Sequence, residues 1–332
     1  MLALNAFLSA TVLLSSSVTV ETLPAAAAVN WIGVSAPSPD VVWVSGSDAT
    51  IGRSLDGGQT WNISKPSTTA LEFRDIEALD SNQAYALSIG ENGNSRVYYT
   101  SNGGESWLLR YRASGEQFLN CMATAPSGEA WITGDTIDGR WDMVRSADGR
   151  NWLTARNAIG QAPQAGEGGL AASGGCIRFN NDVWAIGTAN ATVARVLYKG
   201  VTRIRFQVLD TPIAAGPAAG IASVWPYSDK HMIMVGGDLN HPEARPRIAE
   251  YKDGDFIDWP EPPLDGALYS LTITPSSDVL VTNPSGAALH NASTNEWTQI
   301  SDANIWNSAC VADHCYLVGK EGYIGKFTVN GE

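Results

Sequence analysis

One short segment occurs three times in the first half of the chain. It reads "SLDGGQTW" at residues 54–61, "TSNGGESW" at 100–107 and, one residue shorter, "SADGRNW" at 146–152. Each copy follows two short apolar stretches that are separated by a turn containing glycine, such as "VVWVSGSDATIGRS" before the first copy. Self-similarity at a fixed period indicates a fold built from stacked copies of one small unit.

The repeat continues more weakly through the rest of the chain. The aromatic residue that ends each unit recurs at intervals of 38 to 54 residues, at Trp61, Trp107, Trp152, Phe206, Trp259 and Trp297. A last unit, from about residue 303, lacks its final segment. Units of this length with four short strands are typical of propeller blades, and no apolar period of 3.6 residues persists for the length of a helix.

These observations predict an all-β fold, a seven-bladed β-propeller of four-stranded antiparallel blades. We expect a single domain over residues 29–332, with N- and C-terminal strands closing the ring. The residues just after position 28 would then supply the strand that the last unit lacks. Closure matters because an open ring would leave two strand edges exposed.

The first 28 residues differ from the rest in composition. "LALNAFLSATVLLSSSV" is apolar without a charge before Glu21, and "LPAAAAVN" offers small-residue cleavage sites. This pattern predicts a signal peptide over residues 1–28 and a secreted, extracellular protein. The formal net charge of −13 argues against nucleic acid and anionic membranes as partners. We expect a monomer without membrane insertion.

The chain contains four cysteines, at positions 121, 176, 310 and 315. In a secreted protein an even number of cysteines suggests disulfide bonds. We predict a disulfide between Cys310 and Cys315 across the hairpin "CVADHC". Cys121 and Cys176 lie on predicted inner strands of neighbouring blades and either pair or remain buried free thiols, with a slight preference for free thiols. Zinc-ligand spacing is absent, so we expect no metal and no cofactor.

The motif S-x-D-x-G-x-x-W resembles the Asp-box, also called the bacterial neuraminidase repeat. Together with the preceding "VSGSDATIGRS" pattern, it makes the chain similar to the photosystem II stability/assembly factor-like propellers. The resemblance covers nearly all of the mature chain and implies the fold. It does not imply one activity, because Asp-boxes occur in sialidases, lyases, receptors and assembly factors alike.

The residues of the repeated motif are interpreted as structural. The aspartate can accept hydrogen bonds from the N–H groups of a tight turn, the glycines allow positive φ, and the tryptophan packs between blades. The resemblance places these turns at the outer hairpin of each blade, away from the axis. The structural set is Ser54, Asp56, Gly58, Trp61, Thr100, Asn102, Gly104, Trp107, Ser146, Asp148 and Trp152.

A ligand site is expected where the blades converge, at the starts of the inner strands and the turns after the second strands. The candidate ligand-binding residues are Arg74, Asp75, Asp135, Arg140, Glu167, Asp238, His241 and Trp306. Carboxylates, arginines and aromatic rings suit a polar, saccharide-like ligand. The alternative for the rings, including Trp31, Tyr269 and Trp306, is that they plug the central tunnel.

Two classes of function remain open. The first is a secreted binding or scaffold module for a polar small molecule, a glycan or a protein partner. The second is a carbohydrate-active enzyme, a glycoside hydrolase or polysaccharide lyase, with His241, Asp238 and Glu167 as candidate catalytic residues. A sialidase is disfavoured because neither "FRDI" nor "RPRI" supplies its early arginine motif. The binding module is preferred because no complete catalytic set can be named.

Overall fold

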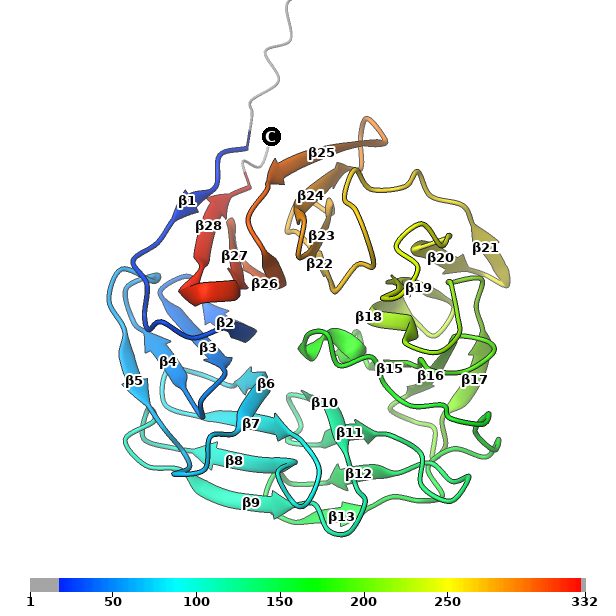
Figure 1. Ribbon diagram of the computed structural model, residues 1–332, viewed down its shortest axis with the longest axis horizontal. Helices are drawn as coiled ribbons and strands as arrows, with labels where there is room; N and C mark the ends of the chain where they lie inside the picture. Colours follow the sequence, from blue (N-terminus) through cyan, green and yellow to red (C-terminus); the bar gives the residue numbers. More distant parts are fainter. Residues whose placement is uncertain (1–17, 330–332) are drawn as a thin grey trace, which may run out of the picture.

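The computed structural model describes residues 18–329, and within this range the chain is a seven-bladed propeller. Seven four-stranded antiparallel sheets stand around a central axis (Figure 1). The predicted fold class is therefore confirmed. Blades are numbered 1 to 7 from β2 onward. No helix among the described residues is long and apolar enough to span a membrane.

Each blade has an inner strand next to the axis and an outer strand at the rim. The inner strands are β2 (Trp31–Ser38), β6 (Glu72–Ala78), β10 (Leu119–Thr124), β14 (Ile177–Asn180), β18 (Ala219–Ser228), β22 (Ser270–Ile273) and β26 (Ile305–Val311). The second strands are β3 (Val41–Gly46), β7 (Ala84–Ile89), β11 (Ala130–Gly134), β15 (Val183–Gly187), β19 (His231–Asp238), β23 (Val279–Asn283) and β27 (His314–Gly319).

The third strands are β4 (Ile51–Ser54), β8 (Arg96–Thr100), β12 (Met143–Ser146), β16 (Arg195–Gly200), β20 (Ile248–Lys252), β24 (Gly286–Asn291) and β28 (Ile324–Thr328). The outer strands are β5 (Asn62–Ser64), β9 (Leu108–Arg112), β13 (Trp152–Thr154), β17 (Gln207–Asp210), β21 (Asp255–Ile257), β25 (Glu296–Ser301) and β1 (Glu21–Thr22). Two 3₁₀ turns, η1 (Gly174–Cys176) and η2 (Lys320–Gly322), complete the described elements.

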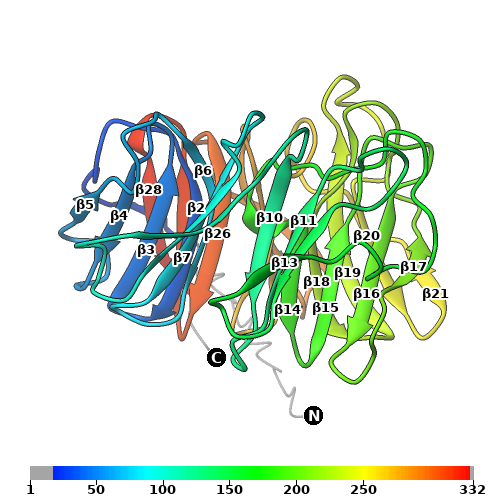
Figure 2. The same cartoon turned by 90° about the horizontal axis from the view of Figure 1, so that it is seen from below.

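The strands run between the two faces of a disc (Figure 2). We call the face at which the inner strands begin the N-face and the opposite one the C-face. The second strands are buried almost throughout, as in "VVWVSG" and "AWITG", because a neighbouring blade covers each side of the sheet. Burial on both sides requires a continuous apolar run rather than alternation. Trp43 shows the packing between blades, since it is completely buried against Phe73 and Ile76 of blade 2.

The ring is closed by pairing between the two ends of the chain. In blade 7, β1 pairs antiparallel with β28, and the Leu23 N–H donates to the Ile324 carbonyl at 2.9 Å. Leu23 is only 3% exposed. Closure by both termini was predicted, but the prediction placed the N-terminal strand after residue 28 and the structure has it at Glu21–Thr22. Cleavage at residue 28 would remove this strand. The signal peptide stays a prediction, and residues 1–17 lie outside the described range.

The first repeated turn, residues 54–61, is tied together by its own side chains. The Thr60 N–H and the Ser54 hydroxyl each donate to Asp56 Oδ1 at 2.8 Å, and the Thr60 hydroxyl donates to Oδ2 at 2.6 Å. Ser54 Oγ accepts the Gly58 N–H at 2.8 Å. These bonds, with those from Thr60 the largest cause, lower the pKa of Asp56 to about 2. The turn lies at the C-face, since its Gly57 N–H donates to the Asp40 carbonyl of the neighbouring turn.

The second turn makes the same pattern with a neutral side chain. Asn102 Oδ1 accepts the Ser106 N–H at 3.1 Å, and the Asn102 amide donates to the Ser106 hydroxyl at 3.0 Å. Thr100 takes the place of Ser54 and accepts the Gly104 N–H at 2.9 Å. An amide can therefore replace the carboxylate, so these turns require hydrogen-bond geometry rather than charge.

Both cysteine pairs form disulfides. Cys310 and Cys315 face each other across β26 and β27, with Cα atoms 4.0 Å apart, which confirms the predicted hairpin bridge. Cys121 and Cys176 are also bonded, with Cα atoms 5.8 Å apart. The slight preference for free thiols was therefore wrong. Two disulfides are consistent with an extracellular protein.

An insertion in blade 4 fills the channel. Gly168 pairs with Ala189, and Ile177 pairs with Ile186. Between these two pairs the inner chain advances by nine residues, whereas the second strand advances by only three. The extra chain, residues 169–176, leaves the blade and lies in the centre of the ring (Figure 1). Its 3₁₀ turn η1 contacts β2, β6, β10, β18 and β22. We call this segment the plug.

The plug is attached by the Cys121–Cys176 disulfide and fits through its glycines. A Cβ atom on Gly174 would lie 2.4 Å from Asp75 Oδ1, which is closer than any real contact. The tunnel is thus filled by backbone, not by the aromatic rings considered above. Of those rings, Trp31 belongs to the core between blades 1 and 7.

Removal of the closing strand should destabilise the ring. A chain that begins at Val29 lacks β1 and the buried Leu23, whose burial is worth about 1.5–3 kcal/mol. We expect its melting temperature to fall by roughly 5 °C or more relative to a chain that begins at Val18. Equal melting temperatures in differential scanning calorimetry would show that β1 does not close the ring.

The contribution of Asp56 to stability should depend on pH. Because the pKa is lowered in the folded state, its contribution is complete above the unfolded value of about 3.9 and is lost as pH falls towards about 2. We expect Asp56→Ala to lower the melting temperature at pH 6, and the gap to wild type to close between about pH 5 and pH 2. Asp56→Asn, which can reproduce the bonds of Asn102, should stay close to wild type at pH 6. A gap that persists unchanged at pH 2 contradicts this account.

Candidate functional site

A cavity of about 420 Å³ opens on the N-face above the plug. Three half-buried aromatic rings stand around it, from Phe118, Tyr269 and Trp306, which belong to blades 3, 6 and 7. The other lining residues are Arg74, Ile89, Asn120, Asp135, Gly169, Leu170, Ala171, Ala172 and Leu239. We call it the N-face cavity. Of the side chains expected at converging blade ends, Arg74, Asp135, Tyr269 and Trp306 belong to this lining.

The plug forms the floor of the N-face cavity. The Arg74 guanidinium donates to the Ala171 carbonyl, and Asp135 Oδ1 accepts the Gly169 N–H at 3.1 Å. Asp135 Oδ1 also accepts from the Asn120 amide at 2.9 Å. Arg74 and Asp135 therefore line the cavity and also bind the backbone of the plug. Their bonds attach the floor of the cavity to blades 2 and 3.

Two of the aromatic rings carry a polar group, the indole N–H of Trp306 and the phenol of Tyr269. Trp306 Nε1 donates to Asn304 Oδ1 at 2.5 Å, which fixes the ring at the start of β26. Burial raises the pKa of the Tyr269 phenol, which stays protonated at neutral pH and remains able to donate. A site of this kind offers apolar surface for stacking and polar groups for orientation.

Several predicted residues lie away from this cavity. Glu167 is completely buried and bound to Arg195 through two hydrogen bonds, one of 2.8 Å from Nε, so it anchors the chain before the plug. Arg140 lines a separate hollow of about 290 Å³ beside Trp141 and Asp142. Asp75 lies on the inner strand β6 but faces the opposite end of the channel. Only Arg74, Asp135 and Trp306 of the predicted ligand set meet in the N-face cavity.

The turn around Asp238 and His241 lies at the edge of the N-face. Asp238 is buried and accepts the N–H groups of Asn240 and His241 at 2.8 and 3.0 Å, which makes it a turn residue. It also lines a shallow hollow that shares Leu239 and Tyr269 with the N-face cavity. The His241 side chain is 68% exposed, with Glu243 at 3.6 Å as its ionic neighbour. Together with buried Glu167, these candidates do not form a convergent catalytic group.

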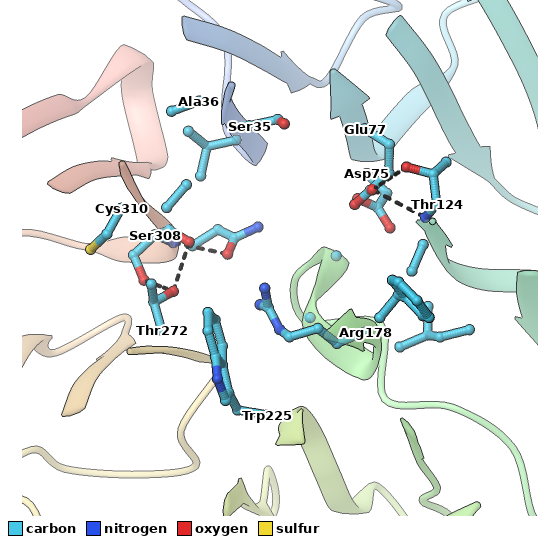
Figure 3. Close-up of a pocket in the computed structure, with 18 residues that line it drawn as sticks. Ser35, Ala36, Asp75, Glu77, Thr124, Arg178, Trp225, Thr272, Ser308 and Cys310 are labelled. Atoms are coloured by element: carbon cyan, nitrogen blue, oxygen red, sulfur yellow. Dashed lines mark hydrogen bonds between the residues drawn. The ribbon is translucent and has the colours of Figure 1, made fainter. Parts of the chain in front are cut away.

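A second cavity, of about 230 Å³, opens on the C-face below the plug (Figure 3). Its charged lining residues are Asp75 and Glu77 on β6 and Arg178 on β14, and Trp225 lies beside the arginine. Sequence reasoning missed Glu77 and Arg178. A signal existed for the first, because residues at i and i+2 of a strand share a face and Glu77 follows Asp75 at that spacing. We call it the C-face cavity.

Burial shifts the titration of the C-face groups. It raises the pKa of Asp75 well above its ordinary value, helped by the charge of Glu77, and it raises the pKa of Glu77 as well. Burial lowers the pKa of Arg178, while the two carboxylates raise it. Desolvation thus outweighs the attraction between these opposite charges, which are held apart in one cavity.

Comparisons with known proteins show the fold. No family model and no curated protein matches the chain. Among solved structures, YCF48 bound to D1 peptide is 14% identical, with a TM-score of 0.66, over 95% of this chain and 98% of that one. A catalytically inactive virginiamycin B lyase from Staphylococcus aureus, with quinupristin, is 11% identical with a TM-score of 0.72, over 94% and 100%. The WD40 propeller domain of Doa1 is 13% identical with a TM-score of 0.64, over 95% and 98%. The chain is thus similar in fold to propellers of differing function, YCF48 among them.

Proposed function

We propose that the protein is a secreted binding module whose N-face cavity holds a polar ligand with an apolar face, in the first place a saccharide. The observation that carries this proposal is the set of half-buried rings of Phe118, Tyr269 and Trp306 around one hollow at the axis. Aromatic surface left open to water at a concave site is typical of ligand recognition. Arg74 and Asp135 add a donor and an acceptor beside the rings.

A carbohydrate-active enzyme is less well supported. Such an enzyme needs an acid and a base at a defined separation around the scissile bond. Asp135, the carboxylate of the N-face cavity, accepts two hydrogen bonds, and the histidine candidate His241 is solvent-exposed at the rim. The residues present can hold a ligand but do not form an acid and base pair.

A peptide is the second candidate ligand. One propeller similar in fold, YCF48, is solved bound to D1 peptide, which supports a protein or peptide partner. The same three rings would serve a peptide, because tyrosine and tryptophan contribute strongly to protein interfaces. A saccharide site would retain glycans, whereas a peptide site would retain peptides.

Loss of the Trp306 indole should weaken ligand binding without unfolding the propeller. We expect Trp306→Ala to weaken retention on a glycan array by about tenfold or more, as for other tryptophans at the centre of a binding site. The control is Phe256→Ala, which removes an exposed ring on the outer strand β21 and should leave retention unchanged.

The array also separates the candidates. If wild type retains no glycan but binds a peptide library, and Trp306→Ala loses that binding, the peptide is the ligand. If wild type retains neither, or if Trp306→Ala binds as wild type while its melting temperature is normal, the N-face cavity is not the binding site.

A further inference from the structure

The C-face cavity contains two carboxylates, Asp75 and Glu77, that share it with Arg178 but form no close ion pair within residues 18–329. Asp75 is 4% exposed, and its Oδ2 accepts the Met122 N–H at 2.7 Å. Glu77 Oε2 accepts the Thr124 N–H and hydroxyl at 3.2 and 3.0 Å. In the described part of the chain, no lysine, arginine or histidine nitrogen lies within 4.0 Å of either carboxylate.

Arg178 shares the cavity but is occupied elsewhere. Its Nε and Nη2 donate to the carbonyls of Val224 and Leu271 at 3.3 and 3.4 Å, and the guanidinium lies 4.4 Å from the centre of the Trp225 ring. Figure 3 shows the arginine across the cavity from the two carboxylates. No other charged side chain lines the cavity. Fully ionised, the three groups leave one negative charge uncompensated in a space enclosed by protein.

The opposite wall provides neutral hydrogen-bonding oxygens. Thr272 and Ser308 belong to blades 6 and 7, and their hydroxyls lie 2.9 Å apart at the cavity surface. Ser35 of blade 1 also lines the cavity, and its hydroxyl accepts the Ala78 N–H at 3.1 Å. These hydroxyls are neutral, so the charge of the cavity comes from the two carboxylates and Arg178. Glu77, Arg178 and Trp225 are half-buried rather than fully buried, so the cavity is reached from the C-face.

We propose that the C-face cavity is a second ligand site, distinct from the N-face cavity, and that it binds a primary ammonium group. The N–H donors of an ammonium suit the acceptor oxygens of the two carboxylates, and its single positive charge balances the three ionised groups of the cavity. Charge-assisted hydrogen bonds in an enclosed site are strong compared with neutral ones. The ammonium belongs either to a free small amine or to a lysine side chain that enters from the C-face. The plug separates the two sites.

The proposal is tested with defined probes in a buffer that contains no amine. Isothermal titration calorimetry at pH 7.5 in phosphate compares n-butylammonium with 1-butanol, and the peptide N-acetyl-Gly-Lys-Gly-amide with its norleucine counterpart. We expect saturable binding of at least one cationic probe and none of its neutral counterpart. Binding of n-butylammonium alone identifies a free amine, and binding of the lysine peptide alone identifies a lysine side chain. Binding of both shows that the cavity accepts an ammonium from either source.

Two conservative variants connect binding to the carboxylates. Asp75→Asn and Glu77→Gln keep an oxygen acceptor for the N–H groups of Met122 and Thr124. Each should lower the affinity for the cationic probe by about ten- to a hundredfold, because one charge-assisted hydrogen bond is lost. The matched control Glu296→Gln removes the same charge from an exposed position on β25 and should bind as wild type. If Asp75→Asn fails to fold, Glu77→Gln alone decides the result.

The pH dependence gives a further readout. Since the carboxylates titrate above their ordinary range, affinity for n-butylammonium, or for the lysine peptide if that is the probe that binds, should fall as pH decreases from 8 towards 5. Within the described residues, Arg178 is the one other charged group that lines the cavity, and a guanidinium stays protonated in this range. The proposal is overturned if neither cationic probe binds, if the neutral probes bind equally well, or if Glu77→Gln binds as tightly as wild type.

Discussion

The ring of blades is closed by a two-residue strand pairing. Glu21 and Thr22 pair with Lys326 and Gly325, residues more than three hundred positions away, and Leu23 fills the space behind them. Without this contact the last blade would have three strands, and the ring would depend on side-chain packing alone. With it, seven inner strands surround one axis, and the space along that axis becomes available for function.

Most of the fold could be predicted from the sequence because the repeated unit is local. The continuous apolar runs of the second strands follow from burial between two blades. The repeated turns are held by hydrogen bonds between residues two to four positions apart, such as Ser54 with Asp56 and Asp56 with Thr60. The start of the ring was harder to predict. β1 is two exposed residues long and is recognised as a strand only through its distant partner.

The candidate site was predicted only in part, for a related reason. Repeat register places Arg74, Asp135 and Trp306 on one face, and the structure agrees. It cannot reveal an insertion whose path depends on contacts with five other inner strands. The plug, "GLAASGGC", carries no periodic pattern, and its role depends on small size. Glu167 was expected at the face because the inner strand was taken to begin there, whereas the chain at that point is buried with Arg195.

The plug also determines the chemistry on each side of it. Above it, aromatic rings and partly satisfied polar groups line a wide hollow. Below it, two desolvated carboxylates and an arginine line a narrower one. A single open channel would join these environments and let water reach Asp75 from both ends. The plug leaves the ladder at Gly168 and rejoins it at Ile177, so it is confined to one break in the inner strand of blade 4. One short segment, bonded to blade 3 through Cys176, therefore divides the axis of the propeller into two compartments of different chemistry.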